Sequence, residues 1–589
     1  MWWIVLPAAW AGPDVFGLGT GADGDLTVTD TQVVNVYSPV VEASLAGASE
    51  LDVADGASFP PGTLLVVHQT LGDAAPVTFV QPPPVLDHLQ LGVGATEYAR
   101  VLQQNGDTLV LNAPLLNGYG PGAQVVRVPE YSSVTVLSGA LAAEPWNGTT
   151  GGILAFAVDG PVVLTGDLDV SGQGFRGAGV DGNAGFDASC TASLDDLGEA
   201  APKGEGGPGY GGVGRGTSGN GGGGGNCANA GGGGGGNGGY GGRGGFGRAD
   251  SGSLDRGGYG GRAASPSTTG YALLGGGGGA ADADDHANSS RGGAGGGVVL
   301  VRARSITGVG RVRAAGVAGI NTLDDGASGG GAGGTVVLSV ADTLECLGVE
   351  APGARGGNVA NGLLLPGVGH GPGGGGGGGR VVLQGASILC PANVAGGAAG
   401  VFLVNDPFGA QPGQAGASLE QGAIYEDADG DGVIAGPGGG PDCDDGDPTS
   451  APGMPEVCDG ADNDCNGPAD DGLPVVTVYE DLDGDGFGDP ASPAMDCGPM
   501  SGFVLDGTDC DDSDPDVFPG APEVAGDGTD QDCDGMDGPD DPPIDTDTDT
   551  DDTDPEVVRR SSGCTCSANS PVFTGLWAFL VPLIAARRR

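Results

Sequence analysis

Short runs of β-branched and apolar residues, separated by Gly, Pro and Asn, dominate the first quarter of the chain. They occupy residues 33–37, 64–67, 108–111, 125–128 and 134–136. Runs of this length between turn-forming residues predict strands, and no helical periodicity of useful length interrupts them. We therefore expect a β-rich N-terminal domain over residues 21–143, built either as a β-sandwich or as the N-terminal cap of a solenoid.

A loose repeat follows this domain, in which two glycines enter an apolar run. These runs fall at residues 151–157, 296–302, 333–339 and 378–384, and second short strands follow at residues 166–170, 310–314 and 347–350. Stacked strand-turn-strand units of this kind bury their apolar faces against their neighbours. We expect an all-β fold with a Gly-rich parallel β-helix, or a related solenoid, over residues 144–420.

A glycine-dominated insert interrupts the repeat at residues 203–297. Within it, Asn237, Tyr240, Arg243 and Phe246 are each separated by two glycines. A period of three matches the polyproline II helix, and Gly would allow such helices to pack closely. The alternative is a flexible loop, which we favour because ordering poly-Gly loses much conformational entropy.

Composition narrows the classes of protein that fit this pattern. The chain has 589 residues, with 128 Gly and 42 Pro but only 5% aromatic and 16% charged residues. This usage is far from that of ordinary globular proteins and argues against a large helical enzyme. The formal net charge of -55 would repel a phosphate backbone, which excludes nucleic acid as a partner.

The negative charge concentrates in an acidic region, residues 424–538, which contains no Lys or Arg. Its recurring feature is D-x-D-x-D-G, in which alternate Asp side chains converge on one hard cation and Gly permits the bend, as in calcium loops. One loop adds Asp489 at its ninth position and is expected to form the better site. Position twelve is never Glu, which disfavours an EF-hand; the alternative is solvated acidic turns without a fixed ion. The predicted metal ligands are Asp427, Asp429, Asp431, Asp462, Asp464, Asn466, Asp470, Asp481, Asp483, Asp485, Asp489, Asp530, Asp532 and Asp534.

Twelve cysteines indicate an oxidising compartment. No C-x-x-C pair occurs and no His follows His370, so disulfides of an exported protein fit better than a zinc site. Proximity along the chain groups Cys190 with Cys227 and Cys346 with Cys390.

Two segments of the acidic region share a longer order of residues. Asp-Cys-Asp-Asp-x-Asp-Pro begins at Asp442 and again at Asp509, and each leads to Pro-Gly-x-Pro-Glu-Val. This order resembles the MopE-type metal-binding repeat of secreted bacterial proteins and is similar to thrombospondin type 3 repeats. Ala525 departs from the repeat, because a cysteine matching Cys458 is expected there.

The resemblance also bears on disulfides and on the metal. The family name carries an association with copper, and four of the five Met residues lie in this region. Thioethers suit Cu(I), whereas Asp oxygens suit Ca²⁺, so calcium is the expected cofactor and copper the alternative.

The expected disulfide pairs are Cys458 with Cys465 and Cys497 with Cys510, which leaves Cys443 and Cys533 to bridge the units or to stay free.

Both ends of the chain carry targeting features. Residues 1–11 combine a short apolar run with Ala-Trp-Ala, which predicts a signal peptide although the usual positive charge is missing. Residues 539–562 predict an extended acidic linker, since Thr and Asp alternate there. Residues 571–586 are apolar and precede three arginines, which predicts a transmembrane tail with the arginines in the cytoplasm.

Residues 563–589 together resemble the C-terminal sorting signal of myxobacterial surface proteins, with a Cys-containing motif, an apolar segment and an Arg cluster. The resemblance implies recognition by an intramembrane processing peptidase and retention at the surface, with Cys564 or Cys566 at the matching position. A plain single-span anchor is the alternative.

These features predict a non-enzymatic, exported protein on the outer surface of a bacterial cell, anchored or processed at its C-terminus. Calcium-binding acidic repeats would support the Gly-rich solenoid in a structural or adhesion role. The expected partners are the membrane, through the C-terminal tail, and a polysaccharide or another surface protein. The alternatives are a copper-capturing protein and a polysaccharide-acting hydrolase, for which Asp159, Asp167 and Asp169 are candidate acids.

Overall fold

The computed structural model divides into two compact units. The first contains the chain up to Val476 together with Met495–Met500, and the second contains Thr477–Ala494 and the chain from Ser501. Strands provide nearly all regular structure in the described residues, beside one 3-10 helix, η1 (Gly56–Ser58), so the all-β prediction is confirmed. The structure describes residues 18–538 without 73–76, 87–91, 113, 180–200, 208–211, 218, 227–228, 250–251, 265–270, 284–289, 361–368, 404, 422–443, 445, 452–453, 465–468 and 499–500.

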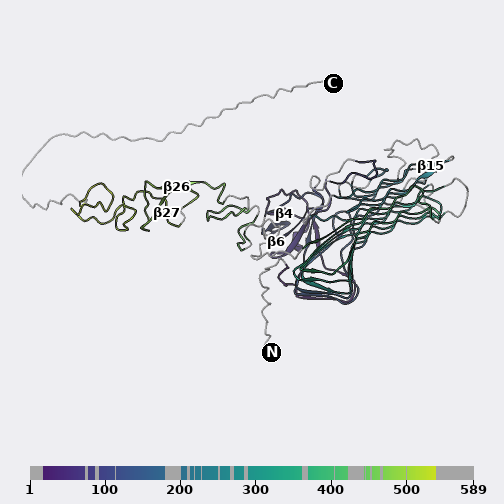
Figure 1. Ribbon diagram of the computed structural model, residues 1–589, viewed down its shortest axis with the longest axis horizontal. Coiled ribbons are helices and arrows are strands. Elements are labelled where there is room, and N and C mark those ends of the chain that lie inside the picture. The colour runs from purple at the N-terminus through teal and green to yellow at the C-terminus, as the bar shows by residue number, and fades with distance from the viewer. Residues whose placement is uncertain are drawn as a thin grey trace, which may run out of the picture. The chain divides into compact units, whose positions relative to one another are not determined.

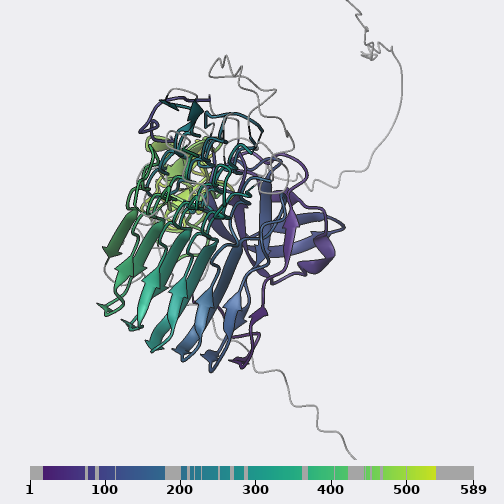
Figure 2. The same cartoon turned by 90° about the vertical axis from the view of Figure 1, so that its right-hand side faces the viewer.

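Two parallel sheets form the core of the first unit, and their strands lie side by side in chain order (Figure 2). The first sheet contains, in spatial order, β1 (Asp25–Val28), β10 (Ser133–Val136), β12 (Ile153–Leu164), β16 (Val298–Gly308), β18 (Thr335–Val340), β21 (Arg380–Gln384) and β24 (Ala417–Gln421), with β9 (Glu130–Tyr131), β19 (Thr343–Leu344) and β22 (Ser387–Ile388) beside this path. The second contains β2 (Gln32–Val33), β11 (Ala140–Ala142), β13 (Asp167–Asp169), β17 (Arg311–Arg313), β20 (Gly348–Glu350) and β23 (Ala392–Asn393). Each coil gives a strand to the first sheet and then one to the second, which is the parallel strand-turn-strand repeat that the sequence predicts.

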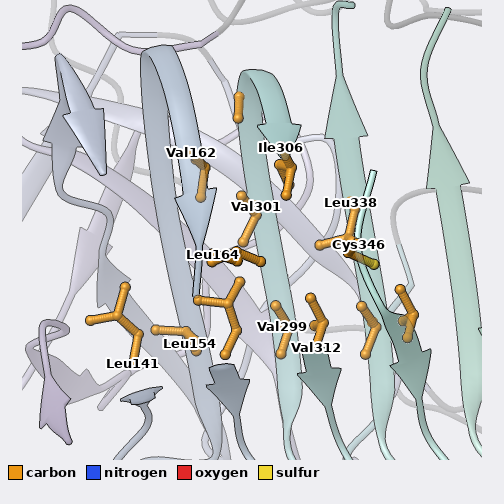
Figure 3. Packing of buried hydrophobic residues seen from close by; sticks show 14 of the residues in the cluster. Leu141, Leu154, Val162, Leu164, Val299, Val301, Ile306, Val312, Leu338 and Cys346 are labelled. Carbon is orange, nitrogen blue, oxygen red and sulfur yellow. The ribbon is translucent and has the colours of Figure 1, made fainter. Parts of the chain in front are cut away.

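The core lies between the two sheets. Alternate residues of the first sheet stack in columns across the coils, because parallel strands in register place the same face inward. One column contains Leu154, Val299, Val336 and Val381, all buried. Figure 3 shows how such side chains meet Val312 from the second sheet.

The other face of the first sheet is buried as well, which explains its uninterrupted apolar runs. An antiparallel sheet packs there, and Val66 and Val126 from it join Ile153 and Val298 in one cluster. Its order is β3 (Tyr37–Pro39), β8 (Ala123–Arg127), β5 (Leu64–Gln69), β6 (Thr96–Asn105), β7 (Thr108–Leu111) and β4 (Glu50–Asp52).

This antiparallel sheet is an insertion into the solenoid, so the predicted boundary at residue 143 differs from the structure. β1 and β2 precede the insertion in the sequence, yet they pair with β10 and β11, which follow it. The solenoid therefore begins at Asp25. The insertion could not be predicted from the sequence, because parallel pairing of strands about a hundred residues apart leaves no local pattern.

The glycine-rich segments are ordered wherever the structure describes them, so the flexible loop that we favoured is wrong for these residues. Successive N–H groups of one segment bond to different neighbouring segments, as expected for polyproline II helices packed in three directions. The long, closely spaced segments are visible in Figure 1, with the small hairpin of β14 (Gly247–Ala249) and β15 (Gly252–Leu254) nearby. Representative donor–acceptor pairs, each at 2.9 Å, are Gly233–Gly223, Gly234–Gly242 and Gly235–Gly330.

We call the packed glycine-rich segments, which include residues 221–225, 231–236, 238–245, 275–279, 329–334 and 373–379, the glycine lattice. Its segments approach so closely that a Cβ atom on Gly234 would lie 2.0 Å from the carbonyl oxygen of Gly375. A Cβ atom on Gly235 would lie 2.0 Å from the carbonyl oxygen of Gly276. Only Gly fits such positions. Paired backbone groups and close packing offset the conformational entropy that poly-Gly loses on ordering.

A disulfide joins Cys346 to Cys390 in successive coils, as their proximity along the chain predicted. Both residues are buried in the cluster between the sheets. The proposed partners Cys190 and Cys227 lie outside the described residues.

The second unit consists mainly of turns. Its region contains a three-stranded sheet with the order β26 (Pro493–Asp496), β25 (Val476–Glu480) and β27 (Phe503–Val504). The predicted signal peptide, acidic linker and C-terminal tail with Cys564 and Cys566 lie outside the described residues. Within the described ranges, no helix has the length and apolar character needed to span a bilayer.

Candidate metal centre

The loop that we expected to form the better cation site follows β25 directly. Its backbone turns at Gly484 and Gly486, whose φ angles of +86° and +101° lie in the left-handed region that favours glycine. The turn brings Asp483 close to Asp481 on one side and to Asp485 on the other. The D-x-D-x-D-G pattern therefore forms the tight turn that its spacing predicts.

Each of the three carboxylates uses one oxygen to hold the backbone of this turn. Asp481 Oδ1 accepts a hydrogen bond from Gly484 N at 2.8 Å, and Asp483 Oδ1 accepts one from Asp485 N at 3.2 Å. Asp485 Oδ1 accepts one from Phe487 N at 2.9 Å. These bonds fix the loop and involve only the Oδ1 atoms.

A later segment, beginning at Asp509, meets this loop and adds two more carboxylates. The N–H of Asp509 bonds to the carbonyl oxygen of Gly488 at 3.2 Å, which docks the segment against the loop. Asp512 Oδ1 accepts a hydrogen bond from Leu482 N at 2.9 Å. Asp509 Oδ1 accepts one from Asp511 N at 2.9 Å, so here too one oxygen serves the backbone.

Two side-chain contacts hold this later segment in place. A disulfide joins Cys510, which directly follows Asp509, to Cys533. The rings of Phe487 and Phe518 stack with centroids 5.7 Å apart and planes 8° from parallel. The position of Asp509 therefore depends on a covalent link and on packing, as well as on backbone hydrogen bonds.

We call Asp481, Asp483, Asp485, Asp509 and Asp512 the Asp483 cluster. Oxygens of Asp481, Asp483 and Asp512 lie within 4.8 Å of one another, and so do those of Asp483, Asp485 and Asp509. The Oδ2 atoms of Asp483, Asp485 and Asp509 are buried and have no hydrogen-bond partner within the described chain. Burying such oxygens unpaired is unfavourable, and a cation placed among them would compensate this cost.

The electrostatics of the cluster support the same conclusion. Desolvation raises the pKa of Asp483, and the negative charges of Asp485, Asp509 and Asp512 raise it further. Desolvation likewise raises the pKa of Asp509, with added repulsion from Asp485, Asp512 and Asp511. A divalent cation would reverse this repulsion and favour the ionised carboxylates.

The donor set consists of oxygen atoms, which suit hard cations such as Ca²⁺. Two nearby cysteines, Cys510 and Cys533, group with Asp509 but are joined in the disulfide and supply no thiolate. The side chains of Met495 and Met536 are each 66% exposed and form no enclosed thioether site. Neither of these two methionines therefore offers a buried soft ligand for Cu(I).

The first unit contains a second group of carboxylates, Glu456, Asp464 and Asp471, whose oxygens lie within 4.8 Å of one another. Glu456 Oε1 accepts a hydrogen bond from Asp464 N at 2.9 Å. Its other oxygen, Oε2, is buried without a hydrogen-bond partner among the described residues. In Glu456, as in the Asp483 cluster, one carboxylate oxygen accepts a backbone hydrogen bond and the other is buried without a partner.

The second copy of the motif reproduces this arrangement. Glu523 Oε1 accepts a hydrogen bond from Asp532 N at 2.8 Å, and Glu523 Oε2 is buried and unpaired within the described chain. Asp537 accepts hydrogen bonds from Gly526 N and Gly528 N, as Asp470 accepts them from two backbone N–H groups in the first copy. The two copies thus fold alike.

Other predicted ligands hold turns. Both oxygens of Asp489 accept hydrogen bonds, from Ala491 N and Ser492 Oγ. Both oxygens of Asp530 accept them from the backbone of Asp534 and Gly535. The assignment of Asp462, Asp470, Asp532 and Asp534 as ligands stays a prediction. Asp427, Asp429, Asp431 and Asn466 lie outside the described residues.

Sequence reasoning missed Asp509, Asp512, Glu456 and Asp471. Asp509, Asp512 and Glu456 lie in the Asp-Cys-Asp-Asp and Pro-Glu-Val stretches, which the D-x-D-x-D-G pattern does not include, and Asp471 directly follows the predicted ligand Asp470. The recurrence of Asp-Cys-Asp-Asp and Pro-Glu-Val was the signal that could have identified Asp509, Asp512 and Glu456.

The predicted disulfide pairing in the acidic region is wrong. Cys458 is bonded to Cys497, and Cys510 to Cys533, whereas Cys458 was expected to pair with Cys465 and Cys497 with Cys510. The reason is that the second motif closes on itself, so that Cys510 near its start meets Cys533 near its end. Cys443 and Cys465 lie outside the described residues.

The candidate acids of a hydrolase are engaged in ion pairs. Asp159 contacts Arg304 at 2.9 Å. Asp167 and Asp169 lie 3.5 and 4.0 Å from Arg313 on the second sheet. These carboxylates thus form part of charged ladders along the solenoid.

Comparison with known proteins identifies one family motif in the chain. Residues 442–471 and 509–538 match the MopE copper-binding family model, described as "Putative metal-binding motif". The second match contains Asp509 and Asp512, and the first contains Glu456, Asp464 and Asp471. No curated protein matches the chain.

Three solved structures show a distant likeness, and all three are phage tailspikes. The tailspike of Acinetobacter baumannii bacteriophage AP22, solved with a capsular saccharide, is 8% identical, with 68% of this chain and 65% of that chain covered and a TM-score of 0.15. The tailspike of Pseudomonas phage LKA1 is 11% identical, with 69% and 67% covered and a TM-score of 0.13. The tailspike of Pseudomonas phage phi297 is 10% identical, with 64% and 63% covered and a TM-score of 0.14. The alignment thus spans just under two thirds of the first of these chains. The chain carries two copies of a metal-binding motif together with a β-solenoid.

Proposed function

We propose that the Asp483 cluster binds Ca²⁺ and that this binding orders the acidic part of a non-enzymatic, exported surface protein. The observation that supports this most directly is that the Oδ2 atoms of Asp483, Asp485 and Asp509 are buried without hydrogen-bond partners in the described chain, in residues whose carboxylates approach within 4.8 Å of one another. Their Oδ1 atoms already hold the backbone, so the remaining oxygens are positioned for a cation.

Calcium fits this cluster better than copper for chemical reasons. Ca²⁺ takes six to eight oxygen ligands in flexible geometry, and carboxylates from two segments together with water can supply them. Cu(I) prefers thiolate, thioether and imidazole ligands. Copper remains the alternative metal, because residues 442–471 and 509–538 match a family model that is named for copper binding.

The architecture supports the wider role that we propose. Disulfides and the metal-binding motif are typical of a protein outside the cytoplasm. The solenoid and the glycine lattice provide a rigid body for a structural or adhesion role, with a polysaccharide or another surface protein as partner. The C-terminal segment, residues 563–589, would hold the chain at the membrane or be processed at Cys564 or Cys566.

Calorimetric titration of the full-length protein with Ca²⁺, and in parallel with Cu(I), tests the metal assignment. We expect saturable Ca²⁺ binding that weakens about tenfold or more in Asp483→Asn and Asp509→Asn, because each removes a charged ligand. The matched control is Asp516→Asn, which removes the same charge from an exposed position.

The outcomes separate the two metals. If Ca²⁺ binding is absent and Cu(I) binds tightly, the calcium proposal fails and metal capture becomes the better function. Equal weakening by Asp516→Asn would show that net charge, and not the Asp483 cluster, determines the affinity.

A further inference from the structure

The first sheet ends at β24, where the apolar columns of the core change character. The column of Leu154, Val299, Val336 and Val381 continues at Ser418. A second column behaves in the same way, since it runs through hydrophobic residues and ends on an acid. Its members are Phe156, Val301, Leu338, Leu383 and, on β24, Glu420.

Glu420 therefore occupies a core-facing register position on the last strand. Residues of parallel strands that are paired in register point to the same side of the sheet. Leu383 is fully buried, whereas Glu420 is exposed at the end of the stack. A charged residue at an inward-facing position of an edge strand is a known means of preventing edge-to-edge association.

The opposite edge of the same sheet differs. Its edge strand is β1, whose core-facing residues Leu26 and Val28 are half-buried and buried. Off this path, β9 pairs with β12, and Glu130 of β9 is buried. Arg100 of the antiparallel sheet binds both carboxylate oxygens of Glu130, at 2.8 and 2.9 Å. In the described chain, β24 is thus the edge of the first sheet that carries exposed core-facing positions.

We propose that Ser418 and Glu420 prevent a second copy of the chain from pairing with this end of the solenoid. Without them, the edge of β24 would offer unpaired backbone groups beside an open apolar core, which is a template for strand pairing. A second copy would meet β24 with its own β24, related by a twofold axis, because the core-facing positions of β24 are exposed whereas those of β1 are at least half-buried. Two Glu420 side chains would then face a shared core, where their desolvation and repulsion are unfavourable.

The test is the oligomeric state of a full-length Ser418→Val/Glu420→Val variant, measured by light scattering during size-exclusion chromatography. We expect the unmodified protein to be monomeric and the variant to form a dimer at micromolar concentration. The control is Ala417→Val, which adds apolar surface on the other face of β24 and should stay monomeric.

A second variant guards against misfolding. Glu420→Gln removes the charge but keeps the size and polarity of the side chain, and we expect it to stay mostly monomeric with a measurable shift toward dimer. Native folding is checked by the Cys346–Cys390 disulfide, mapped by mass spectrometry. The proposal is overturned if the folded double variant stays monomeric, if Ala417→Val dimerises equally, or if the unmodified protein pairs through β24.

Discussion

Asp483 belongs to both groups of converging carboxylates, which places it at the centre of its cluster. Its alternation with Asp481 and Asp485 made these three residues predictable, because spacing within one tight turn is a local property. Asp509 and Asp512 were not predictable as partners, since they reach the loop only through tertiary packing. Residue types also do not show that one carboxylate oxygen accepts a backbone hydrogen bond while the other is buried without a partner.

Single glycines of the lattice should be intolerant of any side chain. We expect Gly234→Ala to lower the free energy of unfolding by about 3 kcal/mol or more, because its Cβ would collide with the Gly375 carbonyl oxygen. Urea unfolding measures this change. The control is Gly120→Ala, where a Cβ meets no atom within 4 Å and the change should stay within about 0.5 kcal/mol. Equal effects at both positions would contradict the close packing.

His68 should make stability depend on pH. It is buried between Thr70 Oγ1 and the Ala272 carbonyl oxygen, each at 2.7 Å, and burial lowers its pKa to about 4. The unfolded chain therefore binds this proton first, near pH 6.5, and the native state loses stability as the pH falls from there toward 4.

Between pH 7 and pH 5 this loss should amount to about 2 kcal/mol for His68 alone. Urea unfolding at the two pH values, compared between the unmodified protein and His68→Gln, isolates the contribution. An identical pH dependence in the two proteins would show that His68 does not titrate in this way.

At the scale of elements, the starts of four long strands of the first sheet could be predicted, whereas β12 and β16 continue to Leu164 and Gly308, past the predicted ends at residues 157 and 302. The Gly-Gly pairs before residues 153, 298, 335 and 380 mark the strand starts, because glycine-rich chain leads into each apolar run. The glycine lattice could not be predicted, since a period of three does not reveal which distant segments will pack together. Its partners come from coils far apart in the sequence, and only the completed fold satisfies their backbone groups.

The disulfide between Cys346 and Cys390 links two neighbouring coils and closes a long segment of chain. We expect Cys346→Ala/Cys390→Ala to lower the free energy of unfolding by about 2–4 kcal/mol, chiefly because the unfolded chain regains freedom. Thermal and urea unfolding of the two proteins measure this difference. A loss below about 1 kcal/mol would indicate that coil stacking alone holds this end of the solenoid.

At the scale of the whole molecule, the two units depend on different sources of stability. The first unit buries continuous apolar columns and pairs its glycine backbone, whereas the second consists mainly of turns around carboxylates. The net charge of -55 adds self-repulsion that cations reduce. We therefore expect the second unit to open more readily when divalent ions are removed.

Limited proteolysis of the full-length protein with and without excess chelator tests this difference. Cleavage between residues 477 and 538 should accelerate at least about tenfold without Ca²⁺, because local opening exposes the chain to the protease. Cleavage within the described parts of the solenoid should stay slow in both conditions. Equal cleavage rates for the second unit with and without Ca²⁺ would contradict the proposed role of the cation.

The threefold hydrogen bonding of the glycine lattice limits how the length of this chain can change. Successive residues of a segment bond to different neighbours, so a single inserted residue would turn every later N–H group toward the wrong neighbour. Insertion of three residues would restore the directions. Length variation inside the lattice should therefore occur in steps of three.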